Sequence, residues 1–193
     1  MRTQPVISFG LLTALTSAAL ASESYRFDQP RSTIGLTVHQ FIGTTHGKFT
    51  KFDGKIDIDR EHPEKSSVTA KIDVRSIDTG IVKRDKHLRS PEFFDVAKFP
   101  EITFKSRNVR QTGQQSGDIL GDLTMHGITK PITLHVKLLS PMSGDTKETR
   151  WAVATEPLKR SDFKLMFSQG TEAISGINQT VAVNIEIEAS RVQ

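Results

Sequence analysis

A basic cluster lies near the middle of the chain, where residues 83–89 read KRDKHLR. If this segment is helical, Arg84 and His87 share one side, because residues three or four positions apart are neighbours on a helix. Together they could hold a phosphate or carboxylate head group through charge-assisted hydrogen bonds. Asp85 is the only acidic residue in the segment. The alternative is a solvated helix face on which Arg84 or Arg89 pairs with a nearby carboxylate.

Three phenylalanines follow the basic cluster within a few residues: Phe93, Phe94 and Phe99. A solvated loop has no use for three such side chains, so we expect them to fold inward over apolar surface. We therefore interpret this part of the chain as a structured lid beside the opening of an apolar barrel.

Patterns for catalysis or metal binding are weak. The chain has no cysteine, and its histidines form no HExxH motif or other compact ligand pair. Residues 161–164, SDFK, match the S-x-x-K string of penicillin-interactive serine enzymes. The flanking pattern predicts a strand, however, which would put Ser161 and Lys164 on opposite faces. The sequence therefore favours a binding protein over an enzyme and predicts no metal or resident cofactor. The histidines are His39, His46, His62, His87, His126 and His135.

Sequence signals predict a short helix within the lid. The stretch Ile72–Ser106 begins and ends as an alternating strand, with a connection far longer than a hairpin needs. Asp78 or Thr79 can cap a short helix over Ile81–Arg89. Ser90 precedes a proline, so the helix should end there, and Ser90 can cap a second turn.

Most of the remaining chain alternates between apolar and polar residues, as half-buried strands do. Such alternation around about eight strands fits an all-β closed antiparallel barrel, which removes the edge-strand problem. A two-sheet sandwich would show the same pattern, so periodicity alone leaves the choice open. The predicted strands are Tyr25–Asp28, Ser32–Ile42, Lys48–Arg60, Ser67–Arg75, Ile102–Val109, Asp118–His126, Lys130–Leu139, Arg150–Leu158, Ser161–Phe167 and Gln179–Ala189.

The first residues read as a secretory signal peptide. Arg2 is followed by an apolar run from Val6 to Leu20 and by a small-x-small cleavage pattern, which predicts cleavage after Ala21. Residues 22–193 are then one exported domain, in a bacterial periplasm, with no transmembrane segment. The formal charge of +4 is too weak to argue for nucleic acid.

Several blocks of the sequence resemble the YceI family. They are IDTGIVKRDKHLRSPEFFDVAKFPEITFKS, GDLTMHGITKPITLHV, KRSDF and the earlier HGKFTKFDGKIDID. The resemblance implies a lipocalin-like extended antiparallel β-barrel in the periplasm that binds a polyisoprenoid, an isoprenoid quinone or a fatty acyl compound. It also implies an association with cytochrome b561-type membrane redox partners. Residues 159–164 read KRSDFK where the family usually reads Asn-Arg-x-Asp-Phe-Gly, which puts the polar contacts at that end of the site in question.

The leading hypothesis is therefore a periplasmic binding or carrier protein whose barrel interior holds a long-chain amphiphile. The alternatives are an accessory to a membrane redox protein through quinone binding and a lipid-modifying enzyme; a homodimer is left open. Arg84 and His87 are the predicted head-group ligands. The predicted tunnel lining, for which a solid core is the competing interpretation, is Phe41, Phe52, Phe93, Phe94, Phe104, Leu123, Met125, Leu134, Phe163, Leu165 and Phe167.

Overall fold

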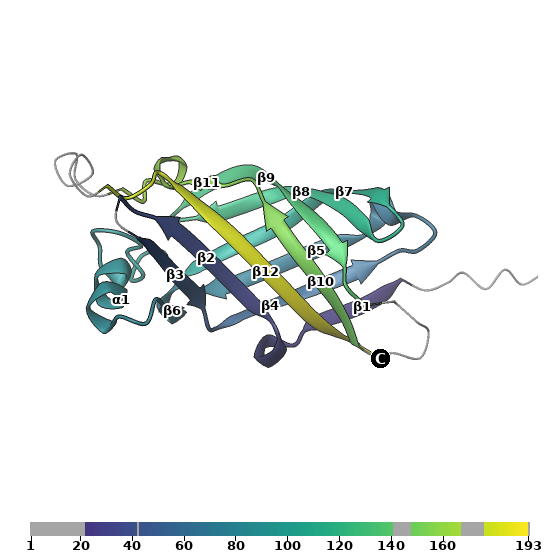
Figure 1. Cartoon of the computed structure of the whole chain (residues 1–193). Helices are drawn as coiled ribbons and strands as arrows, with labels where there is room; N and C mark the ends of the chain where they lie inside the picture. Colours follow the sequence, from purple (N-terminus) through teal and green to yellow (C-terminus); the bar gives the residue numbers. More distant parts are fainter. Residues whose placement is uncertain (1–21, 42, 141–147, 167–175, 193) are drawn as a thin grey trace, which may run out of the picture.

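The computed structural model describes residues 22–41, 43–140, 148–166 and 176–192 (Figure 1). The predicted signal peptide lies outside these residues. Within them the chain is nearly all strand, with one α-helix, α1 (Val82–Arg89), and four short 3-10 turns. The strands are β1 (Glu23–Phe27), β2 (Thr33–His39), β3 (Thr44–Phe49), β4 (Phe52–Ile58), β5 (Ser67–Asp73), β6 (Ile77–Asp78), β7 (Glu101–Gly113), β8 (Ser116–Met125), β9 (Ile128–Leu138), β10 (Glu148–Thr155), β11 (Leu158–Lys159) and β12 (Thr180–Arg191).

Eight of these strands close into an antiparallel barrel, in the order β1-β4-β5-β7-β8-β9-β10-β12 and back to β1. The closing pair joins Tyr25 to Arg191, whereas the other edge of β1 pairs Tyr25 with Ile56. The predicted all-β barrel is thereby confirmed, and the sandwich is excluded. The first half of β12 pairs with β2 instead, and β2, β3 and β6 continue the wall toward α1.

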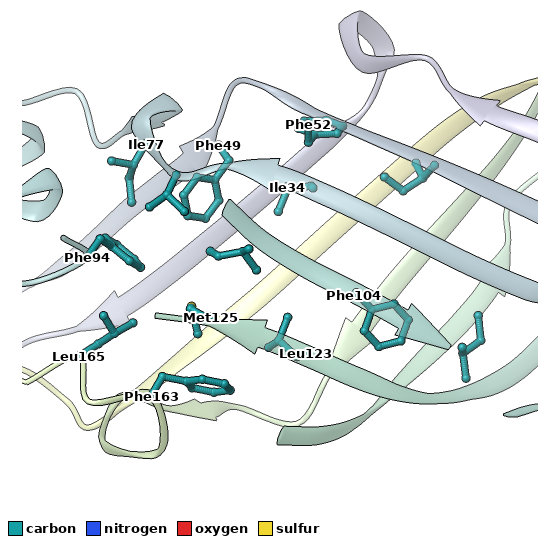
Figure 2. Close-up of a cluster of buried hydrophobic side chains, with 14 of the residues drawn as sticks. Ile34, Phe49, Phe52, Ile77, Phe94, Phe104, Leu123, Met125, Phe163 and Leu165 are labelled. Atoms are coloured by element: carbon teal, nitrogen blue, oxygen red, sulfur yellow. The ribbon is translucent and has the colours of Figure 1, made fainter. Parts of the chain in front are cut away.

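Alternation along each strand decides which side chains enter the barrel. On β12, for example, Ile185 and Ile187 point inward, whereas Asn184 and Glu186 are exposed. Such side chains from all sides of the wall form one apolar core (Figure 2). Because the interior is apolar and the barrel has no free edge around its ring, burial and backbone pairing stabilise the same closed shape.

A segment that the sequence predicts as one strand forms two strands in the structure. The segment Lys48–Arg60 is interrupted at residues 50–51, and its halves belong to different parts of the wall: β3 pairs with β2 and β6, and β4 with β1 and β5. Ser76 causes the break, because its Oγ accepts hydrogen bonds from the backbone N–H of Thr50 (3.2 Å) and Lys51 (3.0 Å). Those donors therefore do not pair with a neighbouring strand.

The predicted strand Ser161–Phe167 is also wrong. Residues 160–163 form a 3-10 turn that ends at Lys164, which adopts the left-handed conformation with φ 55°. The side chain of Arg160 is buried and donates to the backbone carbonyls of Asn178 (3.0 Å) and Leu165 (3.1 Å). These bonds hold the chain in a turn, where a strand would need extended backbone.

The lid helix is confirmed, but its predicted cap is not. Ile81 occupies the N-cap position and makes no side-chain cap bond. Asp85, inside the helix, instead accepts hydrogen bonds from the backbone N–H and the hydroxyl of Thr79. The helix ends before Ser90 as expected, and the carbonyl of Ser90 accepts from the N–H of Phe93 in the following turn (3.1 Å).

Acid should weaken the barrel at its closing strand. Hydrogen bonds from Arg60, and a further one from Tyr25, hold the pKa of Glu23 below its ordinary value of 4.5. A depressed carboxyl pKa contributes stability that is present above the unfolded pKa and is lost as the pH falls through the folded pKa. We expect the free energy of unfolding to fall below about pH 4.5.

The Glu23→Gln variant should show a shallower loss over this pH range in urea titrations. Glu64→Gln, at an exposed glutamate on a surface turn, is the control and should keep the original slope. Equal slopes in wild type and Glu23→Gln would remove Glu23 as the cause.

Candidate ligand-binding site

A cavity of about 330 Å³ lies inside the barrel. Alternate residues of the wall strands line it, for example Val181, Val183, Ile185 and Ile187 of β12. Its walls are almost entirely aliphatic and aromatic, and polar lining residues gather at the end that α1 covers. An apolar cavity of this kind suits a hydrocarbon tail better than a hydrated ligand.

Ten of the thirteen predicted site residues line this cavity. The aromatic and aliphatic ones among them come from the lid, from β7, β8 and β9, and from the turn after β11; Figure 2 shows Phe94, Phe104, Leu123, Met125, Phe163 and Leu165 in the interior. Most of these side chains belong to the buried apolar core and also border the cavity. The ten are Arg84, His87, Phe93, Phe94, Phe104, Leu123, Met125, Leu134, Phe163 and Leu165.

Phe41 and Phe52 do not line the cavity. Phe41 is 90% exposed, because on β2 the inward positions are Ile34, Leu36 and Val38, and residue 41 falls on the opposite parity. Phe52 is buried in the core but is absent from the cavity wall. The third exception, Phe167, lies outside the described residues.

Arg84 lies at the polar end of the cavity. Its guanidinium donates to three neutral oxygens: Nε to Thr79 Oγ1 (2.7 Å), Nη2 to the Thr79 carbonyl (2.8 Å) and Nη1 to Thr45 Oγ1 (3.2 Å). Within the part of the chain that the structure describes, it forms no salt bridge. The alternative interpretation, in which Arg84 or Arg89 pairs with a carboxylate, is not met within the described residues, because Arg89 likewise donates to a carbonyl oxygen, that of Ile77 (2.7 Å).

The basic cluster is divided between two environments. His87 lines the cavity and its Nε2 lies 3.0 Å from Glu92 Oε2, whereas Lys83 and Lys86 are exposed on the outer side of α1. His87 and Lys159 are both exposed and both line the cavity, so the cavity reaches solvent at this end.

The lid phenylalanines form the wall below α1. Phe93 and Phe94 are each 7% exposed, and their ring centroids lie 5.2 Å apart in an edge-to-face arrangement. Phe94 also packs edge-on against Phe49 of β3, at 6.3 Å. The N–H of Phe94 donates to the Leu88 carbonyl (3.0 Å), which fixes the loop against the helix. The predicted inward folding is confirmed for Phe93 and Phe94, whereas Phe99 is half-buried, packs edge-on against His126 at 4.6 Å and does not line the cavity.

A wider hollow of about 930 Å³ lies on the outer wall. It runs across β2, β3, β9, β10 and β12, where outward positions such as Ala152, Ala154 and Asn184 carry small or polar side chains. This hollow is more open to solvent than the interior cavity, and the charged residues Lys48, Asp78 and Glu186 are part of its lining, so it is not suited to enclose a tail. We therefore assign the candidate site to the interior.

Comparison with known proteins identifies the family of this chain. The YceI-like domain family matches residues 25–189, which is most of the chain. This chain belongs to the YceI family. The protein YceI of Salmonella agona is 35% identical over 185 residues, covering 94% of this chain and 93% of that protein.

Two solved structures share the fold of this YceI-family protein. BcnA of Burkholderia cenocepacia has a TM-score of 0.75 at 23% identity, covering 85% of this chain and 99% of that one. A polyisoprenoid binding domain from Saccharophagus degradans, implicated in plant cell wall breakdown, has a TM-score of 0.62 at 21% identity, covering 87% and 98%. At these identities the likeness establishes the barrel fold and leaves the ligand to be argued from the cavity.

Some residues that line the cavity of this YceI-family chain were not predicted from the sequence. Trp151 and Val153 line the cavity from β10, and their alternation with Ala152 and Ala154 carried the signal that could have identified them. Thr45 had no such signal, because its role depends on a contact with α1.

In the described ranges no helix is long and apolar enough to cross a membrane. Across the same residues, no three histidine, aspartate or glutamate side chains gather closely enough to share a metal ion.

Asp85 should stabilise the lid more than its neighbours do. It is 6% exposed and accepts two hydrogen bonds from Thr79. Removal of a buried acceptor leaves its donors unsatisfied, so Asp85→Ala should lower the free energy of unfolding by about 1–3 kcal/mol. Lys86→Ala, on the exposed face of the same helix, is the matched control and should change it by less than about 0.5 kcal/mol. Urea denaturation measures both, and equal values would show that Asp85 does not anchor the lid.

Proposed function

We propose that this YceI-family protein binds a long-chain amphiphile, with the tail in the barrel cavity and the head group at the α1 end. The observation that carries the proposal is the interior cavity itself, whose apolar walls become polar only beside α1. Candidate ligands are a polyisoprenoid, an isoprenoid quinone and a fatty acyl compound. That a protein of the same fold is named as a polyisoprenoid binding domain supports this class.

The cavity has room for a short stretch of such a ligand's tail. Its 330 Å³ falls within the range of small-molecule sites and holds about eleven groups of roughly 30 Å³, the volume of a water or a methylene. At about 0.8 kcal/mol for each buried methylene, the gross gain is about 9 kcal/mol. Ordering the ligand and the lid reduces this figure, but useful affinity remains without many polar contacts.

Arg84 is the best placed head-group ligand. A guanidinium has five N–H donors, and Arg84 uses three of them on Thr79 and Thr45. The remaining two are available to an oxygen of a phosphate, carboxylate or carbonyl. Because Thr79 and Thr45 fix the guanidinium before a ligand arrives, little side-chain entropy is lost on binding.

We also propose that the protein is exported and acts in the periplasm. We take residues 1–21 as a signal peptide and residues 22–193 as one domain, acting as a periplasmic carrier. The family and the cavity favour binding over catalysis. The proposed lining comprises the ten predicted residues that face the cavity.

The direct test is organic extraction of the purified protein followed by mass spectrometry. We expect one prenyl or acyl chain per protein. A quinone in the extract would favour the accessory role beside a membrane redox protein. An extract with no such chain, combined with a folded protein that takes up neither a prenyl nor an acyl probe, would contradict the proposal.

A further inference from the structure

Large apolar side chains are exposed at the end of the barrel where the cavity opens. Phe41, after β2, is 90% exposed; Val82, the first residue of α1, is 86% exposed, and Ile81 before it 51%. We call these three residues the apolar rim. Both segments lie at the same end of the barrel in Figure 1. Because both segments carry exposed apolar side chains at this one end, the apolar rim is a candidate for contact with another apolar phase.

Hydrogen bonds tie the two halves of the apolar rim together. Gln40, next to Phe41, donates from Nε2 to Thr45 Oγ1 (3.1 Å), and Arg84 of α1 donates from Nη1 to the same oxygen (3.2 Å). Gln40, Thr45 and Arg84 all line the cavity. The apolar rim therefore borders the polar end of the cavity.

The charge beside the apolar rim is positive. Lys83 and Lys86 project from the exposed side of α1, and neither forms a salt bridge within residues 22–41, 43–140, 148–166 and 176–192. Three carboxylates lie near them and have other partners: Asp85 is buried against Thr79, Asp78 accepts from the N–H of Gly80, and Glu92 lies 3.0 Å from His87 Nε2. A surface of apolar tips beside uncompensated lysines is complementary to an anionic lipid surface.

We propose that this end of the barrel docks on an anionic bilayer. Phe41 and Val82 enter the boundary between head groups and acyl chains, and Lys83 and Lys86 contact the anionic head groups. A short apolar patch with a few basic residues gives weak, reversible binding. This orientation presents the cavity opening to the bilayer, so a tail can pass between membrane and barrel with little exposure to water. The proposal goes beyond ligand binding and does not depend on the ligand's identity.

Vesicle sedimentation tests the proposal, with a chain that starts at Ser22 and so keeps every described strand. Vesicles of phosphatidylglycerol and phosphatidylcholine should bind it, and pure phosphatidylcholine vesicles should bind it at least tenfold more weakly. The Phe41→Ser/Val82→Ser variant should lose at least tenfold in affinity for the mixed vesicles. Leu120→Ser, at an outward position of β8 that is 43% exposed, is the control and should bind as wild type does.

Lysine variants provide an independent test. Each lysine near an anionic surface raises the binding affinity roughly fivefold. The Lys83→Ala/Lys86→Ala variant should therefore bind the mixed vesicles roughly twenty-five-fold more weakly. Salt should weaken wild-type binding in the same direction. Equal binding to neutral and anionic vesicles, or full binding by both double variants, would overturn the proposal. A rim that instead joins two copies of the chain, seen as a change of mass in solution for Phe41→Ser/Val82→Ser with no change in vesicle binding, would also overturn it.

Failure of docking is distinguishable from failure of the proposed ligand binding. None of the four substituted side chains lines the cavity, so a soluble prenyl probe should bind all variants with wild-type affinity. Loss of vesicle binding with intact probe binding supports the docking surface specifically.

Discussion

Val153→Trp should reduce the affinity for a prenyl probe at least a hundredfold while leaving the protein folded. Val153 lies in the middle of β10, between Val136 and Ile185, and its side chain lines the cavity. Tryptophan adds about seven heavy atoms, which would occupy a large share of the space for about eleven methylene-sized groups. The tail then loses several kcal/mol of burial, at about 0.8 kcal/mol for each displaced methylene.

The adjacent residue provides the control. Ala154 is exposed on the outer wall, so Ala154→Trp adds the same ring outside the barrel. Titration with a fluorescent prenyl probe should give wild-type affinity for Ala154→Trp. Urea denaturation should give Val153→Trp a free energy of unfolding equal to or above that of wild type, since the ring fills an existing void. Wild-type affinity in a folded Val153→Trp would show that the tail binds elsewhere.

Phe94→Ala and Phe52→Ala should destabilise the protein alike and affect the ligand differently. Both phenylalanines are buried, so each truncation should lower the free energy of unfolding by about 3–5 kcal/mol. Only Phe94 lines the cavity, where it packs against Phe93 and Phe49. Phe94→Ala should therefore weaken probe binding about tenfold or more, through lost wall contacts.

Phe52 separates this effect from general destabilisation. Under conditions in which both variants are folded by circular dichroism, Phe52→Ala should retain probe affinity close to wild type. If both variants lost affinity equally, the lid would have no specific part in the site.

Alternation in the sequence was sufficient to predict most of the wall. The inward positions of β7, β8 and β9, among them Phe104, Leu123 and Leu134, follow from period-two patterning alone. The same rule would have excluded Phe41, which has the parity of the outward residues of β2. Barrel closure could not be predicted in this way, because it depends on the pairing of Tyr25 with Arg191, residues at opposite ends of the chain.

The features that escaped prediction depend on contacts between distant segments. Ser76 interrupts the strand pattern at residues 50–51, and Arg160 bonds to the carbonyl of Asn178 and makes a turn where alternation predicts a strand. The partners of Arg84 are Thr79, five residues away, and Thr45, on β3. Threonine hydroxyls in these positions have no signature in a single sequence.

Quenching of the single tryptophan tests the central claim most directly. Trp151 is buried, packs edge-on against Tyr25 and lines the cavity, so its fluorescence reports on what enters the barrel. A fatty acid brominated along its tail should quench Trp151 saturably, at one ligand per chain, and the unbrominated acid should compete. Absence of quenching under conditions in which the acid binds would contradict a tail inside the barrel.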